Sequence, residues 1–306
     1  MLFASSNSHN QPWESTLTEP QNPPTAPQKS EQDRFKFDIV YLVPILASLL
    51  VGLGCAYLLA PVQSDAIPVT PIPETVTGAP WLNATYFVVL VGVAATVFYL
   101  LLKRRSKRII KGLIVVALTT ASGLLSIIYL YAIFANVSYA DYIVLPLTIA
   151  IIVLFDLAIF KIGGVSRDIV VIFMGGALGI FFGKFIPLWS AVLILAFLAI
   201  YDIFAVYKGP VGKIAQSSGL EQLQGLSFSF KDIQMGLGDL VFYSMLTGTI
   251  FFTFVPNLIP TLAAIIGILA GSIITLFMLE KKGIFPGLPF PILLGLAFGL
   301  ATGLLM

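Results

Sequence analysis

Histidine and cysteine are almost absent from this chain of 306 residues, which contains one of each. Because Cys55 is alone, an internal disulfide, a Cys-x-x-Cys redox pair and a thiolate metal cluster are all excluded. His9 lies in a polar N-terminal segment, so a zinc protease with two histidine ligands and a hydrolase with a Ser–His dyad are excluded as well. We expect neither a metal nor a cofactor, and aspartates remain as the candidate acid–base groups.

Charged residues are also scarce. They make up 10% of the chain, against 58% hydrophobic residues, whereas an average soluble domain carries about 25% charged residues. The chain is therefore not a soluble globular protein. Its densest basic cluster, at residues 103–108, lies between two apolar stretches. In that position basic residues indicate membrane topology, and we expect no nucleic-acid partner.

Residues 1–36 are polar and rich in proline, which predicts a disordered tail. Residues 37–306 are predicted to form one all-α membrane domain, because apolar stretches long enough to cross about 30 Å of hydrocarbon recur along them. We predict nine membrane-spanning helices. They are Ile39–Ala60, Ala84–Leu102, Ile109–Phe134, Ile143–Phe160, Ile169–Ile186, Ser190–Tyr207, Gly236–Val255, Ile259–Leu279 and Ile284–Met306.

The basic residues predict the orientation of these helices. With a cytoplasmic N-terminus and an outside C-terminus, 16 of the 17 Lys and Arg residues fall on the cytoplasmic side, and only Lys184 does not. The Asn-x-Ser/Thr sequons at Asn83 and Asn136 then fall outside. Glycines spaced four residues apart, as at Gly175, Gly179 and Gly183, predict close packing between helices.

Two aspartates lie inside apolar spans, Asp202 in LAIYDIFAVY and Asp239 in MGLGDLVFYS. A carboxylate at the centre of a membrane helix costs about 2.5–3.5 kcal/mol on insertion scales, so it needs a partner or a function. Both lie on the order of 5–9 Å inside the predicted cytoplasmic boundary. Two adjacent carboxylates that share one proton can hydrolyse a peptide bond, one as base and one as acid.

The aspartates alone leave other interpretations open: a buried polar pair, acids bound to a lysine, or a cation or proton transporter. The glycines beside Asp239, Gly236 and Gly238, favour a protease. Residues without Cβ permit unusual backbone angles and let an extended substrate strand approach. A third acid, Asp156, is expected to pair with Lys161 or Arg167 or to extend toward water.

A proline-rich element, Phe285–Pro291, precedes most of the last span. Its three prolines predict a non-helical start of that span, and free backbone groups at this depth are tolerated where they line a cavity. Tyr201 precedes Asp202 and points about 100° away from it on a helix. It is therefore expected to shape the site rather than to exchange protons.

These motifs, Tyr201-Asp202, Gly236-Leu237-Gly238-Asp239 and a Pro-x-Leu-Pro element opening at Pro286, resemble the signature of the presenilin and signal peptide peptidase family. The resemblance covers the chain from about residue 37 onward, and the orientation is similar to that of presenilin. It implies that Asp202 and Asp239 are the catalytic pair. Residues implied to shape the active site are Tyr201, Gly236, Leu237, Gly238, Pro286, Gly287 and Leu288; Gly287 stands where the family has alanine.

The resemblance implies an intramembrane-cleaving aspartyl endopeptidase that acts within the lipid bilayer on single-span or signal-peptide-like substrates. Residues 208–235 are short beside the long loop of animal presenilins, which makes self-cleavage there doubtful. The chain therefore looks like a compact archaeal homologue in a prokaryotic cell membrane, without obligate partner subunits and with homo-oligomerisation left open. The alternatives are a prepilin-type GxGD peptidase and a cation or proton transporter or leak channel. The Tyr-Asp pair, the proline element and the nine spans disfavour the peptidase.

Overall fold

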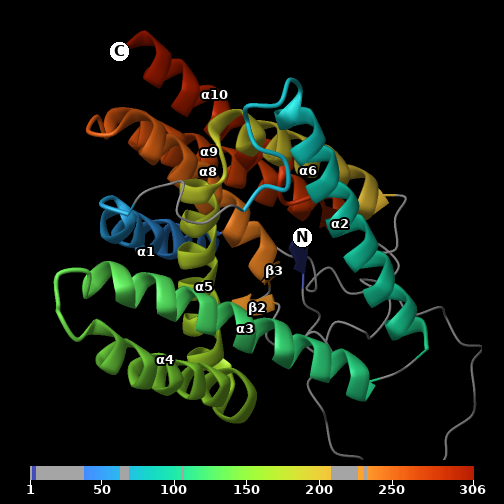
Figure 1. Ribbon diagram of the computed structural model, residues 1–306. Coiled ribbons are helices and arrows are strands. Elements are labelled where there is room, and N and C mark those ends of the chain that lie inside the picture. The colour runs from blue at the N-terminus through green and yellow to red at the C-terminus, as the bar shows by residue number, and fades with distance from the viewer. Residues whose placement is uncertain (1, 5–37, 63–68, 105–106, 208–226, 231–232) are drawn as a thin grey trace, which may run out of the picture.

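The computed structural model describes residues 2–4, 38–62, 69–104, 107–207, 227–230 and 233–306. Nine α-helices dominate these residues (Figure 1). They are α1 (Val43–Leu59), α2 (Ala79–Lys103), α3 (Lys107–Ile133), α4 (Ala140–Asp156), α5 (Gly164–Phe185), α6 (Leu188–Tyr207), α8 (Leu237–Phe254), α9 (Ile259–Lys282) and α10 (Pro289–Leu305). A 3₁₀-helix, Ile39–Leu42, precedes α1, and a π-helix, Leu157–Ile162, extends α4. Most of the predicted tail lies outside the described residues.

The predicted all-α membrane fold is confirmed. Among the described residues, eight helices are long and apolar enough to cross a membrane, and α10 is apolar but has only 17 residues. Many large apolar side chains on the helices are exposed, such as Val116, Leu154 and Ile266. Exposed apolar surface of this extent is typical of a protein surrounded by lipid. The chain is a multi-pass integral membrane protein.

The last helix is shorter than predicted because it begins at Pro289 and not at Ile284. Ile284 and Phe285 form a strand, and Pro286 lies in the turn that follows it. Pro289 and Pro291 belong to the first turn of α10, where the backbone N–H groups have no partner within the helix. Only the first of the three prolines therefore lies in non-helical chain, and the other two start the helix.

Helix α8 lies at the centre of the bundle. It packs against α1, α5, α6, α9 and α10, and 72% of its most apolar stretch is buried, whereas none of the corresponding stretch of α2 is. Glycines allow helices of the bundle to pack closely against one another. A Cβ at Gly183 of α5 would lie 2.7 Å from the backbone of α8. A Cβ at Gly271 of α9 would lie 2.5 Å from the carbonyl group of Phe290 in α10.

Two residues that the sequence singled out lie near the opposite end of the bundle from α6's C-terminus. Asn83 is fully buried; it donates hydrogen bonds to the carbonyl of Ile72 and the hydroxyl of Ser190, and accepts one from the Ile72 N–H. This side chain is closed to a glycan in the folded protein. The ammonium of Lys184 lies 4.5 Å from the ring centre of Phe252 in a cation–π contact. Lys184 is the basic residue that the predicted topology does not place on the cytoplasmic side, and this contact gives its charge a partner.

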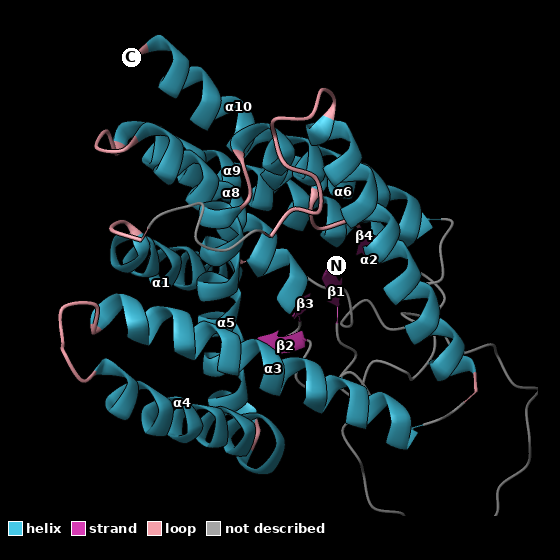
Figure 2. Ribbon diagram, in the orientation of Figure 1, coloured by secondary structure: helices cyan, strands magenta, loops and turns pink. Residues whose placement is uncertain are grey.

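A small antiparallel sheet accompanies the helices (Figure 2). Its strands are β1 (Leu2–Ala4), β2 (Ser227–Phe230), β3 (Ile233–Gly236) and β4 (Ile284–Phe285), in the order β2-β3-β1-β4. Strands β2 and β3 form a hairpin that leads directly into α8, and β4 leads toward α10. The sheet therefore connects the starts of two helices of the central bundle.

Candidate active site

Asp202 and Asp239 lie near the same end of two helices that pack together. Asp202 is in the last two turns of α6, and Asp239 is in the first turn of α8. Asp239 is 5% exposed and Asp202 is half-buried. The two carboxylates are close enough to interact electrostatically. The structure thus brings together the two acids that the sequence placed at similar depth.

The turn between β4 and α10 completes this cluster. The backbone N–H of Leu288 donates a hydrogen bond to Oδ2 of Asp202 over 3.0 Å, and the backbone of Gly287 contacts the same carboxylate. Pro286 and Leu288 are both buried. Since Leu288 is the last residue before α10, its N–H is one of the donors that a helix start leaves free. That donor is used by a carboxylate of another helix.

Tyr243 is a member of the cluster that the sequence argument missed. Its hydroxyl donates a hydrogen bond of 2.8 Å to the carbonyl of Gly287, and its side chain is 1% exposed. It also lies within electrostatic range of both Asp202 and Asp239. An aromatic residue inside an apolar helix is usually part of the core. Its spacing in the sequence could have indicated its position, because Tyr243 follows Asp239 by four residues and such residues lie on the same face of a helix.

Tyr201, which precedes Asp202 on α6, packs against the neighbouring helix α2. The ring of Tyr201 packs on Gly92 of α2, 3.7 Å from the position that a Cβ there would take. A hollow of about 420 Å³ lies between α2 and α6 and is lined by Tyr201 and Phe204. Tyr201 therefore faces α2.

The two glycines before Asp239 do not use the left-handed backbone angles that glycine permits. Gly236 is extended, with φ −74° and ψ 143°, and neither Gly236 nor Gly238 is among the described glycines with positive φ. The room is there, because a Cβ on Gly238 would meet its closest described neighbour, a ring carbon of Phe242, at 3.8 Å. Leu237, between them, is buried.

Comparison with known proteins gives these observations a family context. A family model described as Presenilin matches residues 211–306. Presenilin-B of Dictyostelium discoideum is 33% identical over 124 residues, which is 37% of this chain and 25% of that protein. The chain thus aligns with a quarter of the length of this curated relative.

Two solved structures of a presenilin family intramembrane aspartate protease match nearly the whole chain. The C222 crystal form matches with a TM-score of 0.62 and 21% identity, covering 87% of this chain and 99% of that one. The P2 form matches with a TM-score of 0.60 and 22% identity, covering 86% and 97%. The chain has the presenilin fold. The resemblance to the presenilin family that the motifs indicated is confirmed.

Within the presenilin fold, Asp156 has a different environment from the other two acids. Both of its carboxylate oxygens accept hydrogen bonds from the hydroxyl of Thr119 on α3, at 2.9 and 3.1 Å. Arg167, which was expected as a possible counter-ion, instead pairs with Asp168 at 3.2 Å. The partner of Asp156 is therefore a hydroxyl of the neighbouring helix, which is a structural contact between α3 and α4.

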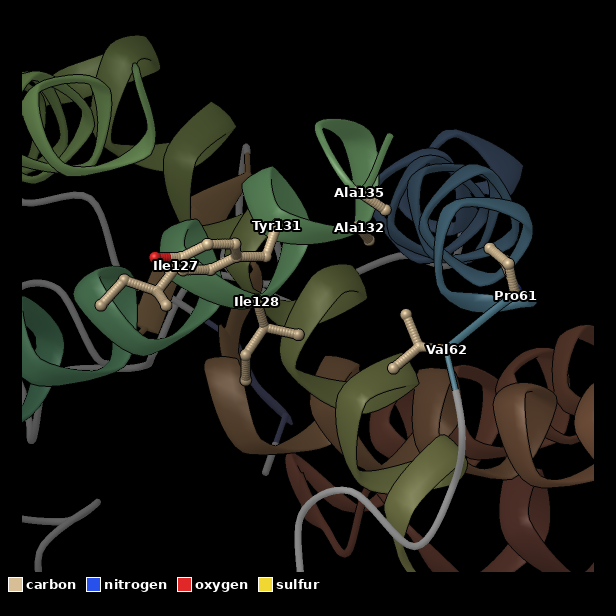
Figure 3. Close-up of a pocket in the computed structure, with 7 residues that line it drawn as sticks. All are labelled: Pro61, Val62, Ile127, Ile128, Tyr131, Ala132 and Ala135. Atoms are coloured by element: carbon tan, nitrogen blue, oxygen red, sulfur yellow. The ribbon is translucent and has the colours of Figure 1, made fainter. Parts of the chain in front are cut away.

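Two apolar cavities of the presenilin fold lie away from the acids. A hollow of about 420 Å³ lies between the end of α1 and α3; it is lined by Pro61, Val62, Ile127, Ile128, Tyr131, Ala132 and Ala135 (Figure 3). A larger cavity of about 640 Å³ lies between α1, α3, α4 and α5. Neither is lined by Asp202, Asp239 or the turn before α10. Among the described residues, the two candidate acids and the turn before α10 meet where α6, α8 and α10 come together.

Proposed function

We propose that this chain is an intramembrane-cleaving aspartyl endopeptidase that hydrolyses peptide bonds within transmembrane segments of other proteins. The observation that carries the proposal is the cluster of Asp202, Asp239 and the Leu288 N–H, contributed by three different helices at one end of the bundle. The presenilin fold supports the same activity. It also favours this activity over a prepilin-type peptidase.

The proposed chemistry uses one proton shared by two carboxylates. The ionised carboxylate takes a proton from water as the water oxygen adds to the scissile carbonyl carbon, and the protonated carboxyl donates its hydrogen bond to the carbonyl oxygen. The C–N bond then breaks, and a proton passes to the leaving nitrogen. Each product leaves with the dyad again holding one proton. No metal, cofactor or covalent intermediate is needed.

Two features of the surroundings fit this chemistry. The Leu288 N–H holds Asp202 in one orientation, so the carboxylate does not need to reorganise in the transition state. Gly238 is exposed and carries no side chain, which lets an extended backbone approach Asp239. A peptide bond inside a helix is shielded, so the substrate segment must unwind before it reaches the acids.

The proposal includes a membrane topology and a class of substrate. The distribution of basic residues predicts a cytoplasmic N-terminus, and in this orientation water reaches the acids from the cytoplasmic side. Substrates are single-span or signal-peptide-like segments that reach the enzyme through the lipid bilayer. Tyr201, Gly236, Leu237, Pro286 and Gly287 shape the active site, and the chain acts without partner subunits.

The test uses the purified chain in liposomes with a single-span substrate. We expect two fragments whose mass places the cut inside the apolar segment, and we expect a pepstatin-like transition-state mimic to prevent the cut. The same liposomes are loaded with a pH- or cation-sensitive dye. Ion flux without peptide cleavage would contradict the proposal and support a transporter or leak channel that uses the same acids.

A further inference from the structure

Two hydrogen bonds join the candidate acids through one short turn. Leu288 N–H donates to Asp202, and the hydroxyl of Tyr243 donates to the carbonyl of Gly287, the residue before it. Tyr243 stands one helical turn beyond Asp239 on α8. A single buried side chain on the helix that carries Asp239 therefore holds the turn that holds Asp202.

We propose that Tyr243 is a positioning residue for the aspartate pair. This inference rests on the proposed protease function. The carbonyl of Gly287 and the N–H of Leu288 belong to the same peptide unit, which is planar. A hydrogen bond that restrains the carbonyl oxygen consequently restrains the direction of the N–H on the other side. Without the hydroxyl, this peptide plane is free to rotate, and Asp202 loses its fixed donor.

The chain offers a matched control in Tyr129. Its hydroxyl also donates to a backbone carbonyl, that of Ala177, over 2.8 Å, and its side chain is 9% exposed. Tyr129→Phe and Tyr243→Phe therefore remove the same kind of bond from two buried positions. Only the second bond reaches the turn before α10.

The experiment measures kcat, KM and thermal unfolding for both variants. We expect Tyr243→Phe to lower kcat at least tenfold with KM changed less than threefold, and to narrow the pH range of cleavage. Each substitution should lower the unfolding temperature by a similar amount, but Tyr129→Phe should keep the kcat of the wild-type chain. Normal kcat in Tyr243→Phe, or an equal loss in both variants, would overturn the proposal. A wild-type chain that cuts nothing would instead contradict the protease function, and the positioning role of Tyr243 with it.

A second inference has an independent basis in the sheet. Strand β1 lies between β3 and β4, and Phe3 pairs with Gln234 on one side and with Ile284 on the other (Figure 2). Strand β3 ends three residues before Asp239, and β4 ends three residues before Leu288. A segment from the start of the chain therefore occupies the strand position flanked by the two sides of the candidate site.

The backbone groups that β1 uses are those an extended substrate would need. Without β1, strands β3 and β4 would each present an edge with free N–H and C=O groups, and such edges bind extended peptides. With β1 in place these edges are paired. The geometry points to Leu2–Ala4 as an autoinhibitory strand that a substrate must displace, an inference that also rests on the proposed protease function. Because β1 belongs to the same chain, the inhibition does not depend on protein concentration.

Proline substitution tests the pairing. Proline cannot donate to a strand ladder, so Phe3→Pro should release β1. We expect KM to fall at least threefold with kcat unchanged. The control, Ser15→Pro, changes the same segment outside the strand and should leave KM unchanged. An unchanged KM in Phe3→Pro would overturn the autoinhibitory role.

A reversible crosslink gives the opposite test. In a Cys55→Ala background, Phe3→Cys and Ile284→Cys place thiols at paired positions of β1 and β4. Oxidation should abolish cleavage and binding of the transition-state mimic, and reductant should restore both. A crosslinked chain that still cuts and binds the mimic would contradict the inference. If even the reduced chain cuts nothing while the crosslink still blocks the mimic, the protease function fails and the strand position stands.

Discussion

The backbone N–H of Leu288 donates a hydrogen bond to Oδ2 of Asp202 across a separation of 86 residues in sequence. The donor belongs to the backbone, so a substitution at position 288 removes the bond directly only if it removes the N–H. It also depends on where α10 begins, because Leu288 caps that helix. The start of the last helix therefore decides the environment of an acid on α6.

Leu288→Pro tests this bond directly. Leu288 has φ −80°, which lies in the range of proline, so the substitution removes the donor and keeps this backbone angle. A hydrogen bond to a charged group contributes about 1.5–3 kcal/mol, which corresponds to roughly a 10- to 160-fold loss of kcat. Leu288→Ala is the control, since it shortens the side chain and keeps the N–H. Equal kcat values in the two variants would show that the N–H has no role.

Asparagine at either acid should abolish proteolysis. We expect Asp202→Asn and Asp239→Asn each to fall to background, and the double variant to be no worse than either, because two groups that act as one unit are not additive. Asp156→Asn should keep most of its activity, since the partner of Asp156 is Thr119. Cleavage assays with a single-span substrate measure all four. Near-normal turnover with either single substitution would end the aspartyl protease interpretation.

The pH profile of cleavage should be bell-shaped. At low pH both carboxyl groups are protonated and no base remains, and at high pH both are ionised and no acid remains. The two limbs belong to the pair and not to either residue. Initial rates measured across the pH range, with folding monitored in parallel, check this expectation. A rate that rises steadily into alkaline pH, with no descending limb, would indicate a different base.

Gly271→Ala should destabilise the fold by separating α9 from α10. The new Cβ would lie 2.5 Å from the backbone carbonyl of Phe290, and overpacking of this kind costs about 1–3 kcal/mol. Gly54→Ala is the control, because its Cβ would have no described neighbour within 4 Å. Thermal unfolding in detergent compares them. Similar unfolding temperatures would mean that the two helices can separate at little cost.

The hairpin β2–β3 corresponds to a weak strand pattern in the sequence. Ser227-Phe228-Ser229-Phe230 alternates polar and apolar residues, two residues follow, and Ile233-Gln234-Met235 alternates again. A two-residue connection between alternating runs is compatible with a hairpin, but Lys231-Asp232 is not one of the turn pairs, such as Asn-Gly or Asp-Gly, that predict one. Strand β1 had no such signal, because a three-residue strand in a polar, proline-rich segment is stabilised only by its pairing partners.

The membrane spans and the identity of the acids depend on local properties, which is why the sequence predicts them. A span is recognised from the apolarity of about 20 consecutive residues, and a buried carboxylate such as Asp202 or Asp239 is conspicuous because of its cost. Contacts between distant segments leave no such trace. The bond from Leu288 to Asp202, the hydroxyl of Tyr243 on Gly287 and the position of β1 depend on how helices α6, α8 and α10 pack. Only the tertiary structure decides them, because directional hydrogen bonds form where packing places the donor and the acceptor.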